Sequence, residues 1–109
     1  MANTERINAL KQVHEAEDSV TNTLKKPGLT APQRRILDEL SDILKEIDKL
    51  LLLNELNDSI EELEGKSKKL KAINKRIKKQ IENLEEVADK VEKAAKAIDA
   101  IVKAFGALG

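Results

Sequence analysis

Apolar residues recur at intervals of three and four along almost the whole chain, and the strict alternation typical of a half-buried strand is nowhere sustained. Such spacing places apolar side chains on one face of successive helical turns. The sequence therefore predicts an all-α protein. At 109 residues, the chain suits a single helical domain spanning residues 1–109.

The first helix is predicted over about residues 4–25, because Pro27 and Gly28 cannot continue it. A new start signal follows directly. Thr30 and Gln33 have the spacing of a capping box, and Pro32 lies in the first turn, where its missing N–H costs nothing. The second helix is predicted over about residues 31–64.

Beyond Gly65 the apolar spacing tightens to a heptad. Its d positions are Leu70, Ile77, Leu84, Val91, Ile98 and Phe105. An unbroken series of this length with charged flanks is typical of a coiled-coil-like seam. The third helix is therefore predicted over about residues 67–105.

Two connections between the second and third helices agree with this pattern. The chain can turn at Gly65 and form a long antiparallel αα-hairpin, or it can break at Asn54–Asp58 and continue as one helix from about 58 to 105. Residues 55–64 carry five acids and no base, while residues 66–79 carry eight bases and no acid. A turn at Gly65 lays the two blocks side by side, so the charges favour the hairpin, and the other connection stays open.

The hairpin predicts an elongated three-helix protein in which the shorter N-terminal helix packs on the base of the hairpin. That helix cannot reach Gly65, so the far part of the hairpin is left as a half-covered two-helix arm. We expect a second copy in a homodimer, or a helical partner protein, to cover the arm through its apolar seam. The candidate interface residues are Leu53, Leu56, Ile60, Leu63, Leu70, Ile73 and Ile77, and the candidate polar residues that fix the register are Asn54, Asn57 and Asn74.

Composition removes most chemistry from consideration. The chain has no cysteine and one histidine, so disulfides and thiolate metal sites are excluded. His14 stands in no zinc-binding motif, and the chain contains neither a phosphate-binding glycine loop nor a nucleophile elbow. We expect no catalytic, cofactor-binding or metal site, and no enzyme activity.

The leading expectation is a non-enzymatic helical interaction or assembly protein. One alternative is a nucleic-acid-binding protein that uses a basic patch of Lys68, Lys69, Lys71, Lys75, Arg76, Lys78 and Lys79. Zero net charge, a single aromatic residue and one arginine in that patch argue against it, whereas an acidic protein partner fits the same patch.

A second alternative is a membrane-surface protein that uses the amphipathic stretch 93–108. This stretch carries only three lysines and no tryptophan, which argues against it. The polar N-terminus and the absence of a long apolar run predict a soluble, cytoplasmic protein.

Overall fold

The computed structural model describes residues 2–52, 60–79 and 84–108, with the side chains of 4–52, 60–79 and 84–104. These residues contain no strand and form four α-helices, namely α1 (Ala2–Leu24), α2 (Ala31–Leu51), α3 (Ile60–Lys79) and α4 (Glu85–Leu108). The prediction of an all-α protein is confirmed for this part of the chain. None of the four helices is apolar over a stretch long enough to cross a bilayer.

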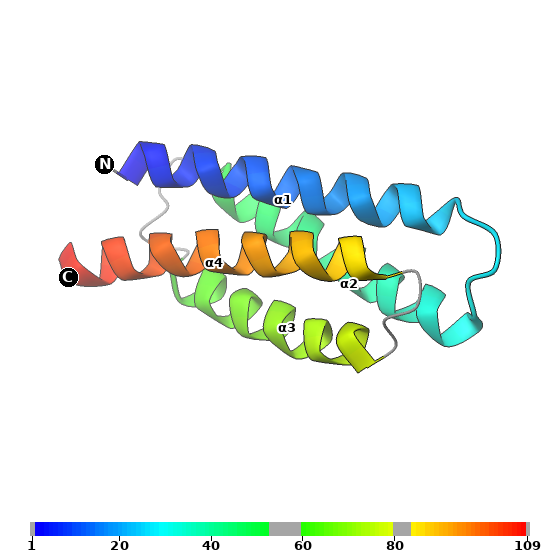
Figure 1. Ribbon diagram of the computed structural model, residues 1–109. Coiled ribbons are helices and arrows are strands. Elements are labelled where there is room, and N and C mark those ends of the chain that lie inside the picture. The colour runs from blue at the N-terminus through cyan, green and yellow to red at the C-terminus, as the bar shows by residue number, and fades with distance from the viewer. Residues whose placement is uncertain (1, 53–59, 80–83, 109) are drawn as a thin grey trace.

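The helices run up and down in turn, so each lies antiparallel to the one before it (Figure 1). Helix α1 contacts α2 and α4, and α3 contacts the same two helices. The result is a four-helix bundle with principal extents of 46 × 20 × 17 Å. Both chain termini lie at the end of the bundle where α2 ends and α3 begins (Figure 1).

The turn between α1 and α2 is built as its sequence predicts. Gly28 has a positive φ of 91°, a conformation that a side chain would strain. The capping box that begins α2 is present, because the Gln33 amide donates to Thr30 Oγ1 at 3.2 Å and the Thr30 amide donates to Gln33 Oε1 at 3.0 Å. Together these features end one helix and begin the next within a few residues.

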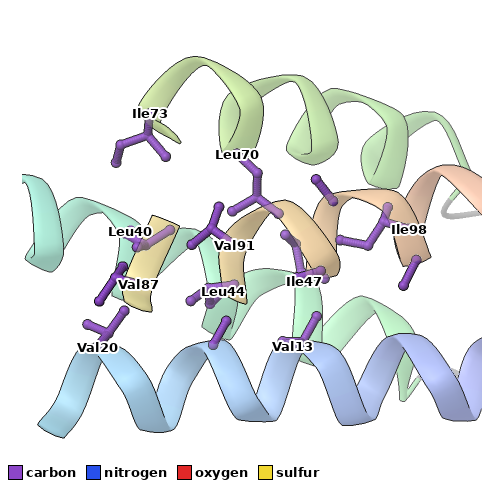
Figure 2. Packing of buried hydrophobic residues seen from close by; sticks show 14 of the residues in the cluster. Val13, Val20, Leu40, Leu44, Ile47, Leu70, Ile73, Val87, Val91 and Ile98 are labelled. Carbon is purple, nitrogen blue, oxygen red and sulfur yellow. The ribbon is translucent and has the colours of Figure 1, made fainter. Parts of the chain in front are cut away.

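One buried apolar cluster draws side chains from all four helices (Figure 2). Val13 of α1, Leu44 of α2, Leu70 of α3 and Ile98 of α4 are all completely buried. Helices α1 and α4 are in contact, and each carries buried alanines, namely Ala9 and Ala16 on α1 and Ala94 and Ala97 on α4. The distance between two packed helices depends on the side chains at their contact, so short side chains allow a closer approach.

The predicted three-helix arrangement is wrong, because the structure has four helices. Gly65 is not a turn but an exposed residue inside α3, and the helix predicted over 67–105 is two helices, α3 and α4. The chain instead changes direction between Leu51 and Ile60. The alternative break at Asn54–Asp58 falls in that interval, outside the described residues, and its single helix from 58 to 105 is also contradicted.

Burial explains why the chain does not turn at Gly65. A glycine inside a helix costs about 1 kcal/mol relative to alanine. Continuing the helix through it places Leu63, Leu70 and Ile77 on one buried stripe, and each is fully covered by the bundle. Burying one such side chain contributes about 1.5–3 kcal/mol, so the stripe outweighs the glycine several times over.

Candidate functional site

The predicted interface residues are mostly part of the core of the chain itself. Leu63, Leu70, Ile73 and Ile77 are at most 3% exposed, and Ile60 is half-buried against the same cluster. Leu53 and Leu56 lie outside the described residues. The half-covered arm is therefore wrong over its described part, because α2 and α4 already cover the seam of α3.

Two of the polar residues that stand in the heptad seam of α3 have partners on α4. Ser67 donates its hydroxyl to Asp99 Oδ1 at 2.7 Å. Asn74 is 6% exposed and donates from Nδ2 to the carbonyl of Ala88 at 3.4 Å. Its Oδ1 is buried and accepts no hydrogen bond within the described part of the chain. Asn54 and Asn57 lie outside that part.

Among the described residues, five basic side chains of α3 form an ion pair; four of them have a partner on α2 or α4, and one has its partner in the acidic block 55–64. Lys66 pairs with Glu46 of α2, and Lys71 pairs with Asp99 of α4 at 2.5 Å. Lys68 bonds Glu64 within α3, at 3.7 Å. Two further pairs cross to neighbouring helices: Arg76 with Glu39 at 2.8 Å, and Lys78 with Glu92 at 3.9 Å.

Four of the seven predicted patch residues therefore face a carboxylate. The exceptions are Lys69, Lys75 and Lys79, which have no ion pair among the residues the structure describes. Pairing lowers the net positive charge of the patch for any anionic partner, while the three unpaired lysines keep theirs.

A hollow of about 320 Å³ opens between α3 and α4, and we call it the α3–α4 slot. It is lined by Leu70, Lys71, Asn74, Lys75 and Lys78 of α3 and by Val91, Glu92, Ala95 and Lys96 of α4. Leu70, Val91 and Ala95 make its floor apolar. The slot exists because the short side chains of Asn74 and Ala95 stand where larger residues would fill the space between the helices.

The single histidine lies in a second candidate site, on the junction of α1 with α2. His14 Nε2 and Asp48 Oδ1 are 2.9 Å apart, and Glu17 stands one helical turn after His14. One ligand atom from each of these three residues, which we call the His14 cluster, lies within 4.8 Å of the others. Burial, and then the negative charge of Asp48, raises the pKa of Glu17 above its usual range.

Comparison of the chain with protein-family models, curated proteins and solved structures finds no match.

The sequence predicts no metal site at His14, because no zinc-binding motif surrounds it. A local signal was present, because His14 and Glu17 share one face of a helix at i,i+3 spacing. Asp48 is 34 residues further along the chain and is brought to them only by the packing of α2 on α1. The α3–α4 slot was missed for a different reason, since it depends on which heptad positions carry short side chains on facing helices.

Two large apolar side chains remain exposed among the described residues. Ile7 of α1 is 66% exposed and Leu52, just after α2, is 59% exposed. Arg6 donates from Nε to the carbonyl of Leu51 at 2.5 Å, so both side chains belong to the same end of the bundle.

Proposed function

We propose that this protein is a non-enzymatic binding module that holds an acidic, amphipathic helix of a partner protein along the α3–α4 face. The α3–α4 slot is the observation that carries the proposal. It combines an apolar floor with four lysines at its rim. A concave apolar surface with a few convergent polar groups is the usual form of a binding site.

The spacing of the rim fits a helix better than a compact ligand. Lys71, Lys75 and Lys78 follow one another at intervals of four and three residues, so they form a stripe along one edge of the slot. A partner helix aligned with this edge presents carboxylates at the same intervals, while its apolar stripe faces the floor.

The charges on the rim are available for such a partner. Lys75 has no ion pair within the described residues. The side chains of Lys71 and Lys78 keep about half of their surface exposed, at 53% and 51%, while they pair with α4 carboxylates. Exposed ion pairs contribute about 0.2–1 kcal/mol each, so exchanging Asp99 or Glu92 for a partner carboxylate costs little.

The apolar anchor supplies most of the expected affinity. A leucine of the partner that fills the slot gains about 1.5–3 kcal/mol. The lysines add less energy than this, but they select acidic partners and speed the encounter.

Nuclear magnetic resonance of the ¹⁵N-labelled protein tests the proposal. The probe is a synthetic amphipathic peptide with leucines on one face and glutamates on the other, and its counterpart has lysines in place of the glutamates. We expect saturable shift changes concentrated on Leu70, Asn74 and Val91 with the acidic peptide, and much weaker binding of the basic one. Shift changes that spread evenly over all four helices would contradict the proposal.

A matched pair of variants separates the slot from the rest of the surface. Ala95→Leu fills the slot and is expected to abolish the response, because the floor is no longer reachable. Ala72→Leu adds the same side chain at an exposed position of α3 that does not line the slot, and is expected to bind as the wild type does. Circular dichroism of both variants confirms that they are folded.

Self-association is a second candidate function. Its support is the exposed apolar end of the bundle, because the half-covered hairpin arm predicted from the sequence is not present among the described residues. Ile7 and Leu52 together offer an apolar surface that a second copy can cover. Sedimentation velocity over a range of concentrations should show a dimer that Leu52→Glu dissociates. A strict monomer at every concentration would exclude this candidate.

A further inference from the structure

The His14 cluster brings together three groups that commonly bind metal ions. His14 and Glu17 come from neighbouring turns of α1, and Asp48 comes from α2. The cluster is at the surface, since 54% of the histidine side chain and 26% of the aspartate side chain are exposed. A dissolved cation can therefore reach it without any rearrangement of the bundle.

Of the two carboxylates in the cluster, Asp48 has His14 as its partner, whereas one oxygen of Glu17 has none among the described residues. Glu17 Oε1 is buried and accepts no hydrogen bond from the described residues. Neither Glu17 nor Asp48 has a lysine or arginine within ion-pair distance in the described part of the chain; the positive groups that act on Glu17 are His14 and, with a smaller effect, Lys45. Two adjacent carboxylates, one of them partly withdrawn from water, repel one another unless a proton or a cation stands between them.

We propose that His14, Glu17 and Asp48 form a divalent metal site of the Zn²⁺ type that links α1 to α2. One imidazole nitrogen and two carboxylate oxygens make a donor set that suits Zn²⁺ or Co²⁺, with water in the remaining position. This inference does not depend on the proposed function, because the α3–α4 slot is lined by different helices.

The geometry needs only small side-chain adjustments. Bonds of about 2.0–2.2 Å in a tetrahedral site separate the ligand atoms by roughly 3.3–3.6 Å. The three atoms already lie within 4.8 Å of one another, and His14 and Asp48 are at 2.9 Å. A metal ion between them therefore requires His14 Nε2 and Asp48 Oδ1 to move apart by roughly 0.4 Å or more and the Glu17 carboxylate to approach by side-chain rotation.

The composition of the chain makes the test unusually clean. With one histidine and no cysteine, any nitrogen-ligated Co²⁺ site in the untagged protein must involve His14 or the N-terminal amine. The probe is CoCl₂, followed by visible absorption, with ZnCl₂ as the competitor. We expect one Co²⁺ per chain, displacement by Zn²⁺, and paramagnetic broadening of amide signals centred on His14 and Asp48 rather than on the N-terminus.

Variants assign the ligands. His14→Gln, Glu17→Gln and Asp48→Asn should each weaken Zn²⁺ binding at least about tenfold, which is the loss caused even by removing an indirect partner of a metal ligand. The control is Asp42→Asn. Asp42 is an exposed acid of α2 that lies outside the cluster, so this variant should bind Zn²⁺ as the wild type does. Circular dichroism confirms folding, and Zn²⁺ should raise the melting temperature of the wild type but not of His14→Gln.

Two results would overturn the site. One is the absence of saturable Co²⁺ or Zn²⁺ binding by the folded wild type. The other is an affinity that His14→Gln and Asp48→Asn leave unchanged, because binding would then reside elsewhere on the chain.

Discussion

Whether replacing Gly65 with alanine raises or lowers the free energy of unfolding depends on the fold. Gly65 lies inside α3 without a positive φ, it is exposed, and an added Cβ would meet no atom within 4 Å. Alanine therefore gains helix propensity and loses nothing. We expect Gly65→Ala to raise the free energy of unfolding by about 0.8–1.0 kcal/mol, the difference between glycine and alanine in a helix interior.

The alternative fold predicts the opposite sign. If Gly65 ended a helix in the left-handed conformation, as the hairpin requires, a Cβ would be strained there and alanine would destabilise the protein by about 1 kcal/mol. Gly28 supplies the matched comparison, because its φ of +91° is in the region that strains side chains. We expect Gly28→Ala to lower the free energy of unfolding.

Urea denaturation followed by circular dichroism at 222 nm measures both variants in the same way. The expected pattern is a higher midpoint for Gly65→Ala, a lower midpoint for Gly28→Ala, and unchanged slopes. A lower midpoint for Gly65→Ala would refute the continuous α3 and with it the four-helix arrangement.

Three further predictions concern the cap, the core and one ion pair. Thr30→Ala removes the hydroxyl that caps α2 and should cost about 1 kcal/mol in urea denaturation; no loss would mean that the capping box is not formed. Leu44→Ala empties a fully buried position and should cost about 2–5 kcal/mol, so a loss below 1 kcal/mol would contradict its place in the core. Burial raises the pKa of Asp99, but hydrogen bonds from Lys71 and Ser67 outweigh it and hold that pKa below its ordinary 3.8. The stability that this carboxylate contributes is therefore present above about pH 4 and is lost as the pH falls. The melting temperatures of the wild type and Asp99→Asn should consequently converge on acidification. A difference that stays constant with pH would show that Asp99 is not paired.

The sequence was sufficient to predict which positions are buried, but not how the chain connects them. The d positions Leu70, Ile77, Leu84, Val91 and Ile98 are all completely buried, as the heptad predicts. Ile77 and Leu84 keep seven-residue spacing across the gap between α3 and α4, and residues 80–83 contain neither glycine nor proline. The apolar heptad spacing therefore gave no indication that one helix ends and another begins there.

Gly65 and the complementary charge blocks, by contrast, indicated a turn where the helix continues. Gly65 suggested a turn where the packing of α3 tolerates a glycine. Complementary charge blocks identified a basic strip that needs acidic neighbours, but any adjacent helix can supply them, and here Glu39, Glu46 and Asp99 do. Short-range sequence features cannot say which helices become neighbours, because that depends on how the whole chain buries its apolar stripes.

The candidate sites were harder to predict than the core for the same reason. The α3–α4 slot depends on facing residues from two helices, and the His14 cluster depends on Asp48 of a second helix. Three of the four rim lysines, Lys71, Lys75 and Lys78, belong to the basic patch that the sequence predicts, whereas Lys96 comes from α4.

A charge-swap calorimetry experiment tests the proposed binding function most directly. The wild type, Lys75→Glu at the slot rim and Lys11→Glu on the exposed surface of α1 are each titrated with the acidic peptide and with its basic counterpart. If the α3–α4 face binds acidic helices, Lys75→Glu loses affinity for the acidic peptide and gains affinity for the basic one, while Lys11→Glu matches the wild type. Equal effects of the two substitutions, or wild-type binding that does not distinguish the peptides, would contradict the account.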